Sequence, residues 1–143
     1  EDEDEDEEDV TSNTVERFDP LTNAWEEVAP MATARGSHAV AVLDGKLYAV
    51  GGFSRENGGH LSSVERYDPA ANAWEAVAPM AMSRACVGMV VLDGKLYALG
   101  GENVEVEDVD VLNAVVRFDP LTNAWEEVAP MATARTVLCA ALL

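Results

Sequence analysis

The 143-residue sequence has few of the residues that most often perform chemistry. It contains two cysteines, Cys86 and Cys139, and two histidines, His38 and His60. Neither histidine has a cysteine or carboxylate at a spacing typical of metal sites. Ser37 and His38 are adjacent, so on a strand they point to opposite faces and cannot form a nucleophile–base pair. We therefore expect no metal, no cofactor and no catalytic residues, and hence no enzyme.

Basic residues are also scarce, because 9 Lys and Arg face 27 Asp and Glu, giving a formal net charge of −18. Nucleic-acid binding and attachment to an anionic membrane both need a basic surface, so we expect neither partner. No apolar run approaches the roughly 20 residues of a membrane helix. The acidic start does not resemble a secretory leader, and the low cysteine content suits a reducing compartment. These features predict a cytoplasmic protein.

Part of the acidity lies in a short tail, since residues 1–9 are all acidic. A block of like charge repels itself, so we expect residues 1–12 to form a disordered acidic tail. Hydrophobic residues make up 48% of the chain, which is enough for the remainder to build a core.

An internal repeat dominates the remaining sequence. Trp25, Trp74 and Trp125 lie in similar contexts, 49 and 51 residues apart. Residues 17–35 read RFDPLTNAWEEVAPMATAR and recur unchanged at 117–135. A middle copy at 66–84 reads RYDPAANAWEAVAPMAMSR. Such a period indicates a repeat architecture.

Local patterns predict four short strands in each period. In the second period they cover residues 37–43, 46–50, 63–67 and 73–77. Asp44-Gly45 is a typical two-residue hairpin turn, and Pro79 ends the last strand because proline has no amide hydrogen. We expect residues 51–59, rich in glycine and polar side chains, to form a loop.

The first two strands of each period are apolar on both faces, so each small sheet needs another sheet packed above and below it. Sheets stacked in a ring, as in a β-propeller, provide this packing. An open sandwich would predict a cleaner alternation of polar and apolar residues.

The repeat resembles the kelch motif, which has a Tyr-x-x-Gly-Gly strand end, a Tyr/Phe-Asp-Pro turn and a tryptophan six residues after the aspartate. The resemblance covers roughly residues 13–143, and the Val-Ala-Pro-Met segments followed by arginine are most similar to those of BTB–kelch adaptors. It implies that these residues are structural: Gly51, Gly52, Gly100, Gly101, Tyr48, Tyr97, Trp25, Trp74 and Trp125.

The resemblance implies an all-β partial propeller of four-stranded antiparallel blades, two of them complete. We expect a partial blade at 13–31, blades at 32–80 and 81–131, and a leading strand of a further blade at 132–143. Such a strip cannot close a ring, and its exposed blade faces favour self-association. The chain is then a piece of a longer product, a ring formed with its own copies, or an incomplete gene model.

The resemblance also implies a site for partner proteins, on the connections between blades and on the loops after the diglycines. By position it points to Arg35, Ser37 and Arg84, to the loop 53–60 with Arg55 and Asn57, and to the loop 102–113. The alternative is that the repeated arginine pairs with a carboxylate or carbonyl of the adjacent blade.

Two further features leave alternatives open. Residues 102–110 contain five acidic side chains, which predicts either selection of a basic partner or a solvated loop. Cys86 and Cys139 lie in apolar segments, so buried inert thiols are preferred to redox sensors.

The function implied by the resemblance is non-catalytic protein–protein interaction, with substrate recognition for a cullin-based ubiquitin ligase as its specific form. The alternatives are a fragment of a kelch-superfamily propeller enzyme and an actin-associated scaffold.

Overall fold

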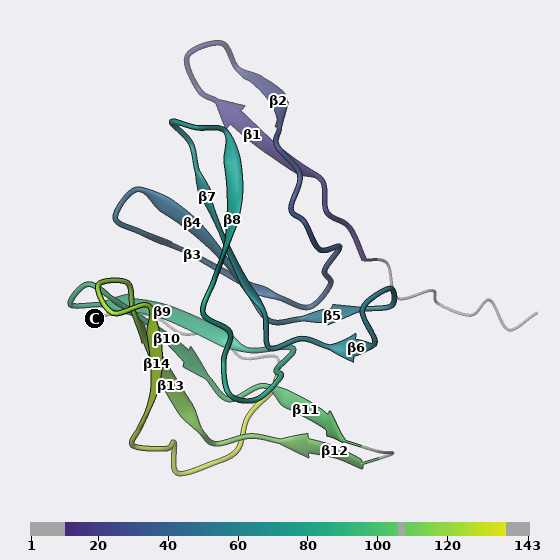
Figure 1. Ribbon diagram of the computed structural model, residues 1–143, viewed down its shortest axis with the longest axis vertical. Coiled ribbons are helices and arrows are strands. Elements are labelled where there is room, and N and C mark those ends of the chain that lie inside the picture. Colours follow the sequence, from purple (N-terminus) through teal and green to yellow (C-terminus); the bar gives the residue numbers. More distant parts are fainter. Residues whose placement is uncertain (1–10, 106–107, 137–143) are drawn as a thin grey trace, which may run out of the picture.

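The computed structural model describes residues 11–105 and 108–136, which form strands joined by turns and loops (Figure 1). The strands are β1 Val15–Asp19, β2 Ala24–Val28, β3 Ala39–Leu43, β4 Lys46–Val50, β5 Phe53–Ser54, β6 Gly59–His60, β7 Val64–Asp68, β8 Ala73–Val77, β9 Gly88–Leu92, β10 Lys95–Leu99, β11 Glu102–Glu105, β12 Asp108–Val111, β13 Val115–Asp119 and β14 Ala124–Val128. The predicted acidic tail lies almost wholly outside the described residues, as does most of the predicted leading strand.

Two four-stranded antiparallel sheets form the body of the molecule. Blade 1 has the strand order β3-β4-β7-β8, and blade 2 has the equivalent order β9-β10-β13-β14. Strands β1 and β2 pair with each other and form an amino-terminal hairpin, which lies at the top of Figure 1. The predicted all-β partial propeller with two complete blades is confirmed, whereas the exact unit boundaries stay a prediction.

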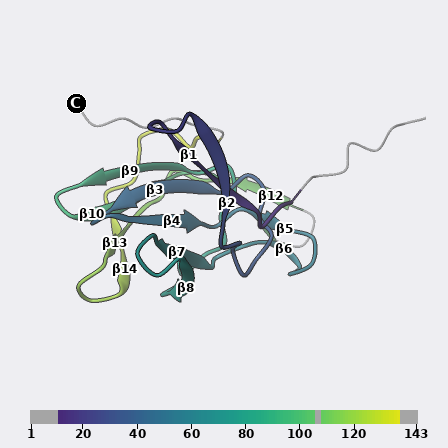
Figure 2. The same cartoon turned by 90° about the horizontal axis from the view of Figure 1, so that it is seen from above.

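The strands after the diglycines correct one expectation. Residues 51–59 and 102–110 were expected to be loops, but β5 pairs with β6 and β11 pairs with β12. Glycines turn the chain out of each blade, and the flanking extended segments then satisfy each other's backbone hydrogen-bonding groups. Both short hairpins project from the same side of the molecule, in the side view and in the view from above (Figures 1 and 2).

The second glycine of each pair allows two backbone segments to approach closely. A Cβ on Gly52 would lie 2.6 Å from the carbonyl oxygen of Gly36, and one on Gly101 would lie 2.7 Å from that of Ala85. Both glycines also have positive φ. A side chain here would therefore displace the segment that leads into β3 or β9.

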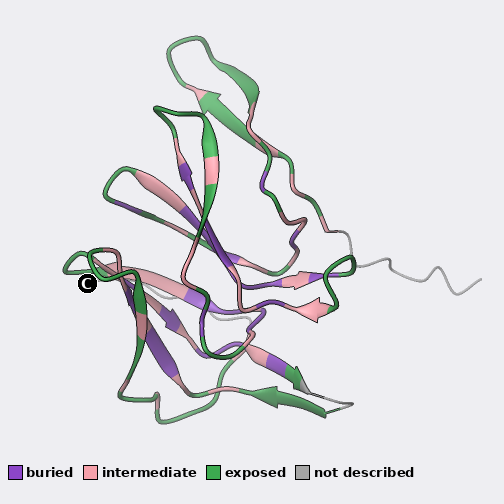
Figure 3. Ribbon diagram, viewed as in Figure 1, coloured by how far each residue is buried: buried purple, intermediate pink, exposed green. Residues whose placement is uncertain are grey.

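The core lies between the two blades, where the strands are buried (Figure 3). Tyr48 of blade 1 and Phe118 of blade 2 are almost fully buried, and their ring centroids are 5.8 Å apart. Leu96 and Val50 are also inaccessible to solvent. Each blade thus covers an apolar face of the other, as the two-sided apolar strands predicted.

Two hydrogen bonds recur where one unit meets the next. The indole Nε1 of Trp74 donates to the carbonyl of Ala29, and that of Trp125 donates to the carbonyl of Ala78, both at 2.8 Å. The amides of Ala29 and Ala78 donate to asparagine Oδ1 atoms of the following unit, at 2.9 Å. The tryptophan hairpin of each blade is therefore hydrogen-bonded to the unit before it.

Candidate functional site

Three of the predicted partner-binding residues lie at the surface. Ser37 is exposed and has a φ of 52°. Arg55 and Asn57 are exposed at the tip of the β5–β6 hairpin, where the amide of Asn57 donates to Ser54 Oγ at 3.3 Å. These three residues thus lie on a connection before β3 and on the β5–β6 hairpin, and their role in partner binding stays a prediction.

Arg35 and Arg84 lie in the interior instead, with 2% and 3% of their surface exposed. Arg35 Nη1 donates to the carbonyls of Gly51 and Ser63, and Nη2 forms an ion pair with Glu65 at 2.9 Å. These acceptors belong to the blade that Arg35 leads into, and not to the adjacent blade. Both guanidinium groups are therefore buried, unlike Ser37, Arg55 and Asn57, and a role for the two arginines in partner binding stays a prediction.

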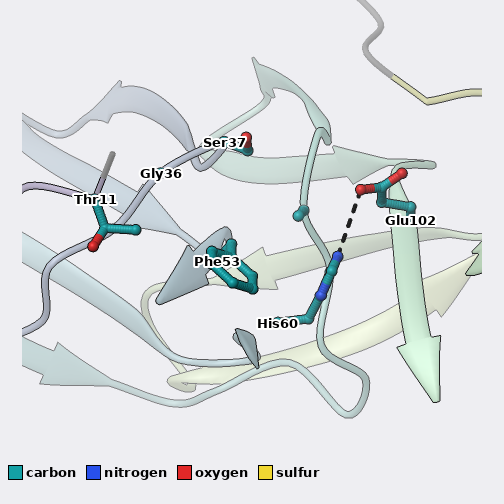
Figure 4. Close-up of a pocket in the computed structure, with 7 residues that line it drawn as sticks. Thr11, Gly36, Ser37, Phe53, His60 and Glu102 are labelled. Carbon is teal, nitrogen blue, oxygen red and sulfur yellow. Dashed lines mark ion pairs between the residues drawn. The ribbon is translucent and has the colours of Figure 1, made fainter. Parts of the chain in front are cut away.

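A pocket of ≈ 220 Å³ lies beside Ser37 (Figure 4). Gly36 and Ser37 come from the segment before β3, and Phe53 and His60 come from the β5–β6 hairpin. Ala85 precedes β9, Glu102 begins β11, and Thr11 completes the lining. We call this the rim pocket. The rim pocket brings together the connections that lead into both blades and the short hairpins of both, which are distant in sequence.

Charge in the rim pocket centres on Glu102. His60 Nε2 lies 3.5 Å from Glu102 Oε1 and forms an ion pair with it when the imidazole is protonated (Figure 4). The thiol of Cys86 makes a weak hydrogen bond of 3.9 Å to the same oxygen. Phe53 packs edge-on against His60, with 5.8 Å between ring centroids. The pocket therefore combines a half-buried carboxylate with an aromatic wall.

Cys86 corrects another expectation. It was expected in a buried strand, but it is half-buried in the segment before β9 and has a φ of 53°. Ser37 holds the same backbone conformation 49 residues earlier, and this equivalence in the repeat is a signal that could have identified the position, although the sequence analysis did not use it. Cys139 lies outside the described residues.

His38 faces a different part of the molecule from Ser37. It helps to line a hollow between the amino-terminal hairpin and blade 1. Burial, and secondarily the nearby Arg35 guanidinium, lower the pKa of His38. At neutral pH this imidazole is therefore uncharged and contributes no positive charge to the interior.

Within residues 11–105 and 108–136, no group of His, Cys, Asp and Glu is arranged to hold a metal ion. The same residues include no helix long and apolar enough to cross a membrane.

Comparison with known proteins places these features in context. A family model described as the Kelch motif matches residues 6–32, 34–81 and 83–132. An F-box/kelch-repeat protein of Arabidopsis thaliana is 47% identical over 49 residues, which are 34% of this chain and 10% of that protein. Kelch-like protein 5 of Homo sapiens is 50% identical over 42 residues, 29% of this chain and 6% of that protein. Kelch-like ECH-associated protein 1A of Danio rerio is 44% identical over 41 residues, 29% of this chain and 7% of that protein. These alignments span a tenth or less of each relative.

Proposed function

Because the chain belongs to the kelch-motif family, whose repeats are generally protein-interaction modules, we propose that it binds a partner protein at the rim pocket and catalyses no reaction. The partner surface comprises the rim pocket and the exposed tip of the β5–β6 hairpin, with Arg55 and Asn57. Its location on connections and hairpins suits recognition, because such segments vary without disturbing the blades that hold them.

The convergence of both blades on Glu102 is the observation that carries this proposal. Its side chain is 28% exposed, so its carboxylate remains accessible to a ligand while its surroundings are partly dry. A lysine or arginine side chain would form an ion pair with Glu102, and Phe53 offers a ring face for cation–π contact. The formal charge of −18 would also speed the approach of a basic partner. We therefore expect a basic peptide segment.

In a longer protein, this surface would recognise substrates for a cullin-based ubiquitin ligase. The similarity to Kelch-like proteins supports an adaptor of this kind, and the protein would then act in the cytoplasm. Actin scaffolding and propeller catalysis are the competing functions. Co-sedimentation with actin filaments would favour the scaffold over the adaptor.

Selection of a random dodecapeptide library on the chain tests the chemistry of the surface. We expect enriched peptides to be rich in lysine and arginine, and Glu102→Gln to weaken their binding at least about tenfold. Asp110→Asn is the matched control, since it removes one negative charge from the exposed strand β12. Enrichment of acidic peptides, or equal losses for both variants, would refute the proposed site.

A further inference from the structure

Two buried arginines occupy equivalent positions in the repeat, but their surroundings differ. Arg35 leads into blade 1 and Arg84 leads into blade 2, 49 residues later. In both, Nη1 donates to carbonyls at the strand ends. The acceptors are Gly51 and Ser63 for Arg35, and Gly100 and Ala114 for Arg84. The two arginines therefore share the hydrogen bonds of Nη1, and they differ in the surroundings of Nε and Nη2.

The remaining donors around Arg35 hold the carboxylate of Glu65. Arg35 Nε and Nη2 lie 3.2 and 2.9 Å from Glu65 Oε2. The amide of Ala32 donates to Oε1 at 2.7 Å, and that of Thr33 donates to Oε2 at 3.3 Å. Ser63 Oγ accepts a further bond from Nη2, at 3.1 Å. A guanidinium and two backbone amides thus form a cradle that fits a planar carboxylate.

Blade 2 keeps the donors of this cradle and lacks its acceptors. Val116 takes the place of Glu65 in β13, and Ala114 takes the place of Ser63. Ala81 and Met82 occupy the positions of Ala32 and Thr33. Among the described residues, Arg84 Nε is buried and has no hydrogen-bond partner. A buried guanidinium with an unsatisfied donor loses hydration that nothing in its own blade replaces.

A pocket of ≈ 310 Å³ lies at this position, and Arg84, Ala114, Val116, Ala81 and Met82 all line it. Met82 is 42% exposed, so the pocket is accessible from solvent. The two small or apolar replacements leave space where blade 1 holds the side chains of Glu65 and Ser63. Because the two blades are equivalent, a group that resembles the side chain of Glu65 should fit this pocket.

We propose that this pocket, which we call the Arg84 pocket, binds a carboxylate in the position that Glu65 occupies in blade 1. The carboxylate belongs either to a small organic acid or to an acidic residue of a protein partner. It would accept hydrogen bonds from Arg84 Nε and Nη2 and from the amides of Ala81 and Met82. The pocket lies between the connecting segment 80–84 and blade 2, and it shares no lining residue with the rim pocket.

One glutamate that lines the pocket, Glu127, acts on the Arg84 guanidinium. Glu126 and Glu127 both line the Arg84 pocket, and both are exposed. Burial lowers the pKa of Arg84, and the charge of Glu127 opposes that shift. Glu127 pairs across the sheet with Val116 and makes no hydrogen bond to Arg84 in the structure. It therefore competes electrostatically with an external carboxylate, and Glu127→Gln should lower the acetate concentration needed for half-saturation.

The arginine side-chain NMR signals of the ¹⁵N-labelled chain test the site. We expect sodium acetate to shift the Arg84 Nε–H signal saturably, while sodium chloride at equal ionic strength does not. Inorganic phosphate tests whether any anion suffices, and a short glutamate-containing peptide tests the protein source. An unmoved Arg84 signal, or equal responses to acetate, phosphate and chloride, would overturn the proposal.

A pair of variants makes the test independent of ligand identity. Val116→Glu supplies the carboxylate within the chain, and Val116→Gln is its neutral control of nearly the same shape. We expect Val116→Glu to abolish the acetate response and to melt at a higher temperature than Val116→Gln. The opposite order of melting, or a full acetate response in Val116→Glu, would count against a carboxylate site. Glu102→Gln should leave the response unchanged, so failure of the rim pocket would be distinguishable.

Discussion

Residues 17–35 and 117–135 have the same sequence but opposite patterns of burial. Phe18 is 42% exposed, whereas Phe118 is fully buried. Further along the two copies the order reverses, because Arg35 is 2% exposed while Arg135 lies at the surface. Sequence alone therefore does not decide which half of the repeat is buried.

The neighbouring sheet accounts for the difference. In the second copy, the β13–β14 hairpin packs its aromatic face on blade 1. In the first copy, the segment after the hairpin runs along blade 1. There the amides of Ala32 and Thr33 donate hydrogen bonds to the carboxylate of Glu65. In each repeat the hairpin and the segment after it thus pack against different neighbours. The same substitution made at equivalent positions of the two copies can therefore separate their contributions to stability.

The largest contrast is expected at the two phenylalanines. Phe118→Ala should lower the free energy of unfolding by about 4 kcal/mol, because it opens a cavity against Tyr48. Phe18→Ala should cost about 1 kcal/mol, since half-exposed Phe18 packs mainly on Trp25. Urea denaturation followed by circular dichroism measures both. Equal losses would mean that the two hairpins are buried alike in solution.

The arginines should show the reverse contrast. Arg35→Leu leaves the buried carboxylate of Glu65 without its counter-ion and should cost about 3 kcal/mol. Arg135→Leu changes an exposed residue and should stay within about 0.5 kcal/mol. The same denaturation experiment applies. A large loss for Arg135→Leu would indicate that another segment covers it.

The exposed amino-terminal hairpin, β1–β2, predicts association between copies of the chain. Trp25 is 67% exposed, and Ala129 is the counterpart of the alanines that accept the other two indoles. Both halves of the repeated contact are therefore present at opposite ends of the described chain. We expect sedimentation velocity to show concentration-dependent association, which Trp25→Ala weakens about tenfold, or about 1.4 kcal/mol.

Leu21→Ala is the control for this association. Its counterpart Leu121 is 93% exposed although its hairpin is docked on blade 1, so Leu21 should contribute little. Association that survives Trp25→Ala and disappears on Val42→Lys would instead assign it to the exposed face of β3. Experiments need at least about 0.15 M salt, because two strongly acidic copies repel each other.

The smallest contrast concerns the asparagines. Asn123→Gly removes the acceptor for the Ala78 amide and should cost about 1 kcal/mol. Asn23→Gly should change stability less, because no such amide partner is present for it in the described residues. Both positions have positive φ, 49° and 53°, which glycine tolerates. Thermal melts resolve a difference of this size.

The local structure was predictable because local chemistry determines it. Asp44-Gly45 forms the predicted hairpin turn, with both φ values positive, and strand β4 has the predicted bounds. The β5–β6 hairpin was not predicted because its sequence is rich in glycine, and the β11–β12 hairpin was not predicted because its acidic residues were given more weight than its alternating valines. Their pairing instead completes the backbone hydrogen bonds of segments that the blades hold close together.

The candidate site was predictable only in outline. The repeat pointed to Ser37 and to the loop 53–60, and it left open that the arginines pair with a carboxylate or carbonyl. It assigned those acceptors to the adjacent blade, whereas they belong to the blade that each arginine leads into. The direction of the arginine side chains depends on carbonyls that face them only after the blade has formed. The contact between His60 and Glu102 likewise requires both blades to be docked, so no sequence spacing encodes it.

In both blades the indole hydrogen bond points toward the amino terminus, from Trp74 back to Ala29 and from Trp125 back to Ala78. During synthesis, each carbonyl acceptor therefore leaves the ribosome before the indole that will bind it. Blades can then assemble one after another in the order of translation, each new one docking on a template already made. A nascent chain would always present an open acceptor at its growing end, ready for the next blade.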